Sequence, residues 1–156
     1  MRVTSATSLE EMMPVIDASF AIWAILPVVA GSGVDVTKRL EEWHRVGELL
    51  VAPMLWMAEC TSAVSSATYM GLISEEEGIR ALEDLSGLEV ETAAMDGAMC
   101  VAAFGWAQRL GQRRAYDGFY LALAEQLEME LWTADRRLVN GARQAGVEWV
   151  RWVGEV

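Results

Sequence analysis

The chain has 156 residues, of which 53% are hydrophobic and 22% are charged, so its composition predicts one compact domain and excludes an intrinsically disordered chain. With 23 acidic against 12 basic residues, the formal net charge of −11 argues against broad, non-specific attraction to nucleic acid. The longest apolar stretch, Phe20 to Ala30, is too short to span a bilayer, and Met1 to Met12 lacks a secretory pattern, so we expect a cytoplasmic protein with no membrane partner.

Short apolar runs alternate with helical patterns in the first half of the chain. In order, the expected elements are a strand over 14–17, a helix over 18–26, a loop over 30–33, a helix over 36–47, a strand over 49–52 and helices over 54–69 and 74–87. Pro27 ends the first of these helices and Gly71 ends the third. Ser74 and Glu77 form a capping box at the start of the fourth helix.

The same alternation continues to the end of the chain. The expected elements are a candidate edge strand over 88–91, helices over 93–110 and 116–127, a strand over 130–133, a helix over 134–145 and a final strand over 147–153. Strands separated by helices predict an α/β fold with helices on both faces of a mostly parallel central sheet of four to five strands. We expect a single domain over residues 12–156 and a loose N-terminal extension over residues 1–11.

Four carboxylates have a route to the carboxyl end of this sheet. Asp17 follows the first strand, and Asp135 follows the strand over 130–133, at the edge where open α/β sheets bind ligands. Glu59 and Asp117 lie in the first turns of helices. Two carboxylates about 4 Å apart repel by roughly 4 kcal/mol at an effective dielectric constant near 20, so a cluster of four needs protons or divalent cations. We therefore expect a site for Mg²⁺ or Mn²⁺, which prefer carboxylate and water oxygens.

Four segments around these carboxylates resemble the ordered motifs of PIN domains, particularly those of VapC-type toxins. They are Val15-Ile16-Asp17-Ala18-Ser19, Ala58-Glu59, the run from Tyr116 to Ala124 and the run from Thr133 to Leu138. The Tyr-Asp-x-x-Tyr-Leu-Ala-Leu-Ala run followed by Thr-Ala-Asp is the most specific of these signals. The resemblance extends over residues 13–153.

The resemblance implies a PIN-like three-layer α/β/α fold and a metal-dependent endoribonuclease, the toxin of a type II toxin–antitoxin pair. It implies that Asp17 and Asp117 are the principal metal ligands and that Glu59 and Asp135 complete the site. Hydroxyl positions that steady the carboxylates or a metal-bound water are matched by Ser19 and Thr133. The implied reaction uses a water nucleophile and leaves a 5′-phosphate and a 3′-hydroxyl. The implied partners are RNA, a small antitoxin and a second copy of the chain in a homodimer.

Four arginines near the carboxylates could partly offset the repulsion between this acidic protein and nucleic acid. Arg113 and Arg114 precede Asp117, while Arg136 and Arg137 directly follow Asp135, so these four side chains are candidates to contact RNA phosphates. Solvation, or interaction with a helix C-terminus, explains the same positions equally well. Some relatives carry a further acid where Arg136 stands, which leaves a second metal site open.

Simpler explanations exist for each feature. The three aspartates could serve merely as helix caps, and Glu59 is informative only if it does not face solvent.

We expect Trp56, Trp106 and Trp132 in the core, and Trp23 and Trp43 either in the core or in a groove for a partner. Cys60 and Cys100 are expected to be free thiols, and a lone His44 predicts no zinc site.

Two other functions compete with the nuclease. One is a non-catalytic PIN-like binding or regulatory module, which the acidic net charge favours and the complete set of four acids opposes. The other is a phosphotransferase or phosphatase with Asp17 as nucleophile. Such enzymes usually carry a second aspartate two residues further on, where this chain has Ser19.

Overall fold

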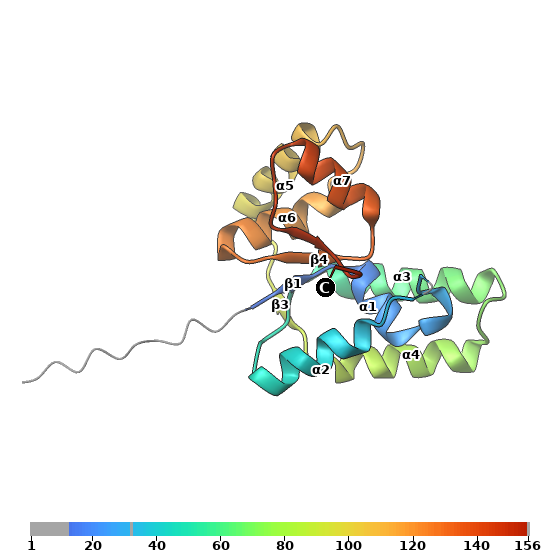
Figure 1. Cartoon of the computed structure of the whole chain (residues 1–156). Helices are drawn as coiled ribbons and strands as arrows, with labels where there is room; N and C mark the ends of the chain where they lie inside the picture. The colour runs from blue at the N-terminus through green and yellow to red at the C-terminus, as the bar shows by residue number, and fades with distance from the viewer. Residues whose placement is uncertain (1–12, 32, 156) are drawn as a thin grey trace, which may run out of the picture.

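The structure, a computed structural model, describes residues 13–31 and 33–155 (Figure 1). Five parallel strands form one sheet in the order β3-β2-β1-β4-β5. They are β1 (Val15–Ile16), β2 (Val51–Pro53), β3 (Glu91–Ala93), β4 (Leu131–Thr133) and β5 (Val150–Trp152). The predicted α/β class with a parallel central sheet is therefore confirmed. The extension predicted over residues 1–11 lies outside the described residues.

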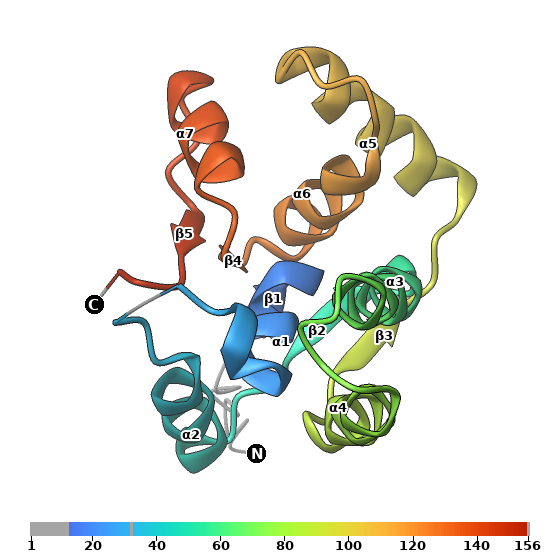
Figure 2. The ribbon, with the colours of Figure 1, turned by 90° about the vertical axis from the view of Figure 1, so that its right-hand side faces the viewer.

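Helices cover both faces of this sheet, which confirms the predicted three layers (Figure 2). One layer holds α1 (Ala18–Ile25), the short 3₁₀ helix η1 (Pro27–Val29), α2 (Val36–Val46), α3 (Leu55–Tyr69) and α4 (Glu75–Gly87). The other layer holds α5 (Gly97–Arg109), α6 (Tyr116–Leu127) and α7 (Arg136–Gln144). Among the described residues, no helix has both the length and the hydrophobicity needed to cross a membrane.

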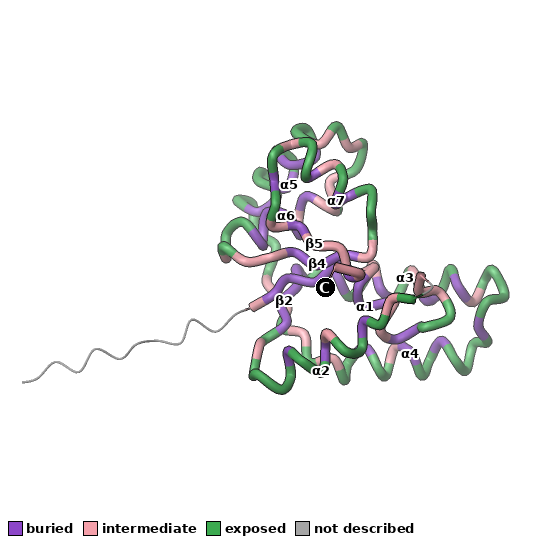
Figure 3. Tube along the Cα trace, viewed as in Figure 1, coloured by how far each residue is buried: buried purple, intermediate pink, exposed green. Residues whose placement is uncertain are grey.

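The core lies where α1 and α6 meet the central strands (Figure 3). All residues of β1, β2 and β4 are buried, as expected for parallel strands covered on both faces. Trp43 stacks on Phe20 with 5.6 Å between ring centroids and meets Trp132 edge-on at 5.5 Å. Trp56, Trp106 and Trp132 are buried as predicted, and the burial of Trp43 favours its core alternative over a partner groove. Both cysteines are free thiols, as predicted.

Several predicted boundaries were wrong: the final strand, predicted over 147–153, spans only Val150–Trp152, and two others lie around the third strand. The apolar–acidic alternation over 88–91 predicted a strand there, but β3 begins at Glu91 because its register is set by pairing with β2, where Thr92 lies opposite Ala52. Glu89 adopts a positive φ of 53°, which is incompatible with a strand at that point. Helix α5, predicted to begin at residue 93, begins at Gly97, and Asp96 is its N-cap, since its carboxylate accepts from the N–H of Met99 at 2.8 Å.

Gly118 allows α6 to approach α5 closely. A Cβ atom on Gly118 would lie 2.2 Å from the carbonyl oxygen of Ala103, so a side chain there must displace backbone. We expect Gly118→Ala to lower the free energy of unfolding by about 1–3 kcal/mol. Gly105→Ala is the control, because a Cβ atom there meets nothing within 4 Å and alanine should stabilise the helix by about 0.5–1 kcal/mol. Urea unfolding measures both, and a Gly118→Ala protein as stable as the parent would contradict the close approach.

Candidate functional site

The carboxyl ends of β1 and β4 lie side by side at the point where the strand order reverses. From β1 the sheet extends outward through β2 to β3, and on the other side β4 is followed by β5 (Figure 2). Ligands of open α/β sheets bind at such switch points. Ile16 is in register with Trp132, so the residues that follow them, Asp17 and Thr133, come to the same edge.

A network of hydroxyl groups holds Asp17 at this edge. Ser19 Oγ donates to Asp17 Oδ1 at 2.7 Å, and Thr133 Oγ1 donates to Asp17 Oδ2 at 2.5 Å. The backbone N–H of Phe20 also donates to Oδ1, at 2.9 Å, so Asp17 is the N-cap of α1. Asp17 therefore caps α1, and the two hydroxyls singled out by the family resemblance contact its carboxylate directly.

Burial raises the pKa of Asp17 to about 7. The side chain is 5% exposed, and removal from water disfavours the charged form. Hydrogen bonds from Thr133, Ser19 and Phe20 lower the pKa, while the negative charge of Asp117 raises it further. Asp17 is thus a carboxylate whose charge is only partly compensated by the protein.

Asp117 lies in the first turn of α6, as predicted, and is held by Gln112. Gln112 Nε2 donates to Asp117 Oδ2 at 2.8 Å. Burial raises the pKa of Asp117, the Gln112 hydrogen bond lowers it, and the charge of Asp135 raises it. The Oε1 atom of Gln112 is buried without a hydrogen-bond partner among the described residues. Sequence reasoning missed Gln112, because a single glutamine in a turn matches no chemical motif.

Glu59 lies in the second turn of α3 rather than the first, since the helix begins at Leu55. Its partner is Tyr120 of α6, whose hydroxyl donates to Glu59 Oε1 at 2.6 Å. Burial raises the pKa of Glu59, with the Tyr120 hydrogen bond opposing and the charge of Asp117 adding to the effect. Burial also raises the pKa of Tyr120 well above its usual value, so its hydroxyl remains a donor. Glu59 is therefore partnered inside the protein and is not a purely solvated acid.

Asp135 caps α7 and is the most exposed of the four acids. Its Oδ1 accepts from the N–H of Arg137 at 2.8 Å, and its own N–H donates to Thr133 Oγ1 at 3.0 Å. The charge of Asp117 raises the pKa of Asp17 and of Glu59, and the charge of Asp135 raises the pKa of Asp117.

The types of ligand atom at this site suit a divalent cation, but the side chains are not oriented to coordinate one. Carboxylate and hydroxyl oxygens are the ligands that Mg²⁺ and Mn²⁺ prefer. Within residues 13–31 and 33–155, however, no three His, Cys, Asp or Glu side chains form a group arranged to hold a metal ion. Each of the four acids is turned toward its own protein donor. Coordination by three of them at once therefore requires side-chain rotation.

The four arginines proposed to contact RNA are all exposed. None of them forms an ion pair with another part of the described chain. The guanidinium of Arg136 lies over the ring of Trp152, 3.6 Å from its centroid, which restricts where that charge can point. Arg109, by contrast, donates to the carbonyl oxygen of Ala145 at 2.7 Å.

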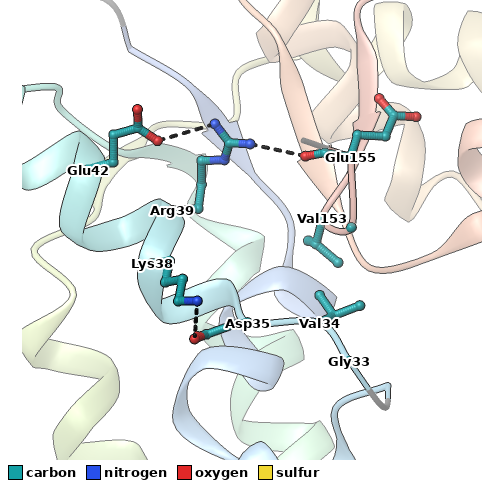
Figure 4. Close-up of a pocket in the computed structure, with 9 residues that line it drawn as sticks. Gly33, Val34, Asp35, Lys38, Arg39, Glu42, Val153 and Glu155 are labelled. Atoms are coloured by element: carbon teal, nitrogen blue, oxygen red, sulfur yellow. Dashed lines mark hydrogen bonds and ion pairs between the residues drawn. The ribbon is translucent and has the colours of Figure 1, made fainter.

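A separate cavity of about 300 Å³ lies between α2 and the C-terminal residues (Figure 4). Its charged groups already pair with one another. Arg39 donates to the carbonyl oxygen of Glu155 at 3.0 Å and pairs with Glu42 at 3.5 Å, while Lys38 lies 4.0 Å from Asp35. None of the four candidate acids lines this cavity, so it is not part of the same site.

A match to a family model shows which protein family has this fold. A model described as PIN domain matches residues 15–144, a range that contains all four acids. The chain belongs to the PIN-domain family. This PIN domain is 32% identical to Ribonuclease VapC12 of Mycobacterium tuberculosis, strains CDC 1551 / Oshkosh and ATCC 25618 / H37Rv, over 137 residues that cover 82% of the chain and 91% of the relative.

A solved structure shares the fold of this PIN domain. It is PAE2754 from Pyrobaculum aerophilum, with a TM-score of 0.66, 17% sequence identity, and coverage of 97% of this chain and 93% of the other. At that level of identity the likeness supports the three-layer architecture.

Asp17 gives the stability of this PIN domain a distinctive pH dependence. Its folded-state pKa of about 7 lies above the ordinary aspartate value of 3.8, so between these pH values the folded state binds more protons than the unfolded state. The free energy of unfolding should therefore fall as pH rises through this window, by up to about 4 kcal/mol. Asp17→Asn, measured by urea unfolding with a chelator present, should show a shallower fall and greater stability near pH 7.5.

The matched control is Asp84→Asn, on the exposed side of α4. It should reproduce the pH dependence of the parent. If the Asp17→Asn and Asp84→Asn proteins lost stability equally between pH 4 and pH 7, burial of the Asp17 charge would not be the cause.

Proposed function

We propose that this PIN domain is a metal-dependent endoribonuclease that hydrolyses RNA phosphodiester bonds, and that it acts as the toxin of a type II toxin–antitoxin pair. The observation that carries the proposal is the meeting of Asp17, Ser19 and Thr133 at the β1–β4 switch point, where the charge of Asp117 also raises the pKa of Asp17. Membership of the family and the similarity to Ribonuclease VapC12 support the same reaction. A cognate antitoxin and a homodimer are part of this proposal.

In the proposed site, Asp17 and Asp117 are the principal ligands of Mg²⁺ or Mn²⁺, and Glu59 and Asp135 complete the set. A divalent cation held there lowers the pKa of water and offsets negative charge on a phosphoryl oxygen. The protein orients the ligands: the hydroxyls of Ser19 and Thr133 fix Asp17, while the amide of Gln112 fixes Asp117. Such supporting hydrogen bonds set ligand orientation in metal sites generally.

The proposed reaction is the hydrolysis of one phosphodiester bond. Water adds to the phosphorus, the bond between phosphorus and the 3′ oxygen breaks, and the 3′ oxygen takes up a proton. The products are a 3′-hydroxyl on one fragment and a 5′-phosphate on the other. The exposed arginines next to Asp117 and Asp135 contact neighbouring phosphates, which reduces the repulsion expected from a net charge of −11.

The structure disfavours the competing reaction with Asp17 as a phosphorylated nucleophile. Both of its oxygens accept hydrogen bonds, from Ser19, Thr133 and the N–H of Phe20, and the side chain is almost fully buried. As a nucleophile, an oxygen of Asp17 would have to leave these donors to reach phosphorus, whereas Oδ2 accepts one hydrogen bond and keeps a lone pair for a cation. No contact in the described residues favours a purely structural or regulatory module, so the cleavage test below decides between it and the nuclease.

Cleavage of a mixed RNA pool with and without Mn²⁺ tests the reaction. We expect cutting only with the metal, products that carry a 5′-phosphate, and a loss of more than about 100-fold in Asp117→Asn, beyond the 10- to 100-fold typical for removal of a supporting residue. Asp84→Asn is the control for purity and folding. Equal cutting by the Asp117→Asn and Asp84→Asn proteins would point to a contaminant, and no cutting by any of them would favour the non-catalytic module.

Gln112→Ala tests the supporting hydrogen bond to Asp117. The variant should raise the concentration of Mn²⁺ needed for half-maximal cleavage and lower activity at limiting metal by about 10- to 100-fold, with recovery at high metal. Gln108→Ala, at an exposed position of α5, is the matched control and should behave as the parent. A Gln112→Ala protein with unchanged metal dependence would contradict a positioning role for this side chain.

A further inference from the structure

Arginine guanidinium groups lie over tryptophan rings at three places in the described chain, and one of these stacks differs from the other two. The stacked pairs are Arg39 on Trp132, Arg109 on Trp106 and Arg136 on Trp152. Arg39 and Arg109 also donate to backbone carbonyl oxygens, at 3.0 and 2.7 Å, so their N–H groups are already used inside the protein. Arg136 lies closest to its ring, 3.6 Å from the centroid, and forms no ion pair within residues 13–31 and 33–155.

The ring of Trp152 is held in place by the end of β5. Trp152 is half-buried and packs against the hydrophobic core. Gly154 lies against the six-membered part of the ring, since a Cβ atom on Gly154 would be 2.0 Å from its Cζ3 atom. The indole N–H is buried without a hydrogen-bond partner among the described residues, so no polar contact of Trp152 explains its presence. A ring confined in this way also confines the guanidinium that lies over it.

The stacked pair lies at the same edge of the sheet as the candidate acids. Trp152 is in register with Thr133, which donates to Asp17, so the three residues follow one another across β5, β4 and β1. Neighbouring strands are about 4.8 Å apart, which places the backbone of Trp152 roughly 10 Å from that of Asp17. Arg136 directly follows Asp135, and α7 packs beside β5 (Figure 2). The cation is therefore beside the acids but separated from Asp17 by one strand.

The position of Arg136 is unfavourable for the helix that contains it. Asp135 is the N-cap of α7, Arg136 and Arg137 are its first two residues, and its first turn contains no acid. The positive end of the helix dipole disfavours cations there. Interaction with a helix C-terminus, one of the two simpler explanations of these arginines, therefore does not apply to Arg136.

We propose that Trp152 is a positioning residue, which holds the guanidinium of Arg136 ready to bind an RNA phosphate adjacent to the cleaved phosphodiester. The proposal rests on the function proposed above and identifies one phosphate contact that the fold prepares in advance. At 3.6 Å the guanidinium is face-on to the ring, which leaves the N–H donors at its edge free for phosphate oxygens. Because the side chain is already ordered, binding costs less conformational entropy than it would with a mobile arginine.

The salt dependence of RNA binding tests Arg136 in a chain that carries Asp117→Asn and is designed not to cut. The probe is a fluorescein-labelled single-stranded RNA of about 12 nucleotides, read by fluorescence anisotropy at several KCl concentrations. Arg136→Ala should reduce the slope of log affinity against log salt by about 0.7, the value for one phosphate contact to a single strand. Arg80→Ala, at an exposed position of α4, is the matched control and should leave the slope unchanged.

Arg136→Lys tests the stack without disturbing the core, because Arg136 is exposed. Lysine keeps the charge but has no planar group to lie on the ring. The salt slope should therefore stay as in the parent, while binding weakens by about 2- to 10-fold, the cost of ordering one long side chain. Unchanged affinity of the Arg136→Lys protein would exclude a role for the stack.

A double-mutant cycle tests Trp152. Trp152→Leu should weaken binding by about 2- to 10-fold, while Trp152→Phe, which keeps a ring and removes the unpaired indole N–H, should stay within about twofold of the parent. In a chain that also carries Arg136→Ala, Trp152→Leu should have no further effect, because Trp152 acts only through Arg136. Trp149→Leu is the control for loss of a half-buried tryptophan, since no arginine of the described chain lies over Trp149, and it should show no coupling to Arg136.

Each contrary result overturns the proposal in a recognisable way. An equal salt slope for the Arg136→Ala and Arg80→Ala proteins would exclude the phosphate contact. An effect of Trp152→Leu that is the same with and without Arg136 would show damage to the fold rather than positioning. Undetectable RNA binding by the Asp117→Asn chain would also overturn the proposal. Failure of metal-dependent cleavage alone would overturn only the proposed reaction, since binding is measured in a chain designed not to cut.

Discussion

The parallel pairing of β1 with β4 is the constraint on which the rest of the structure depends. This pairing brings Asp17 and Thr133 to one edge although they are 116 residues apart, and Ser19 joins them from the first turn of α1. A buried carboxylate is costly unless hydrogen bonds compensate its charge, and here three donors do so in part. The same contacts fix the start of α1 and the end of β4, so the fold and the candidate site share one set of interactions.

The buried carboxylates of the candidate site lower the free energy of unfolding of the protein. Burial raises the pKa of Asp17, Glu59 and Asp117, and the charge of Asp117 acts on both of the other two. Each acid is turned to a separate donor, which limits repulsion between neighbouring charges. Natural proteins retain such locally destabilising charges at functional sites, where the charge is needed for chemistry.

The distribution of charge is compatible with the proposed binding of an acidic substrate by an acidic protein. Exposed acids are spread over other surfaces, such as the first turn of α4, while α3 has one charged residue beside the site. The arginines near Asp117 and Asp135 are exposed and unpaired within the described chain. In the proposed function, local charge beside the acids, rather than the net charge, would govern the approach of a polyanion.

The sequence by itself determined the alternation of strands and helices, the capping box at Ser74 and Glu77, and the two aspartates that follow strands. These features depend on residues within one or two turns of each other, and local patterns report them. Only the tertiary structure decided the start of β3, because its register is set by β2. Tyr120 reaches Glu59 across 61 residues, and nothing local to either residue specifies that contact. The effect of the Asp117 charge on Asp17 and Glu59 arises in the same way, since distances between elements follow from strand order and helix packing, which a single sequence does not display.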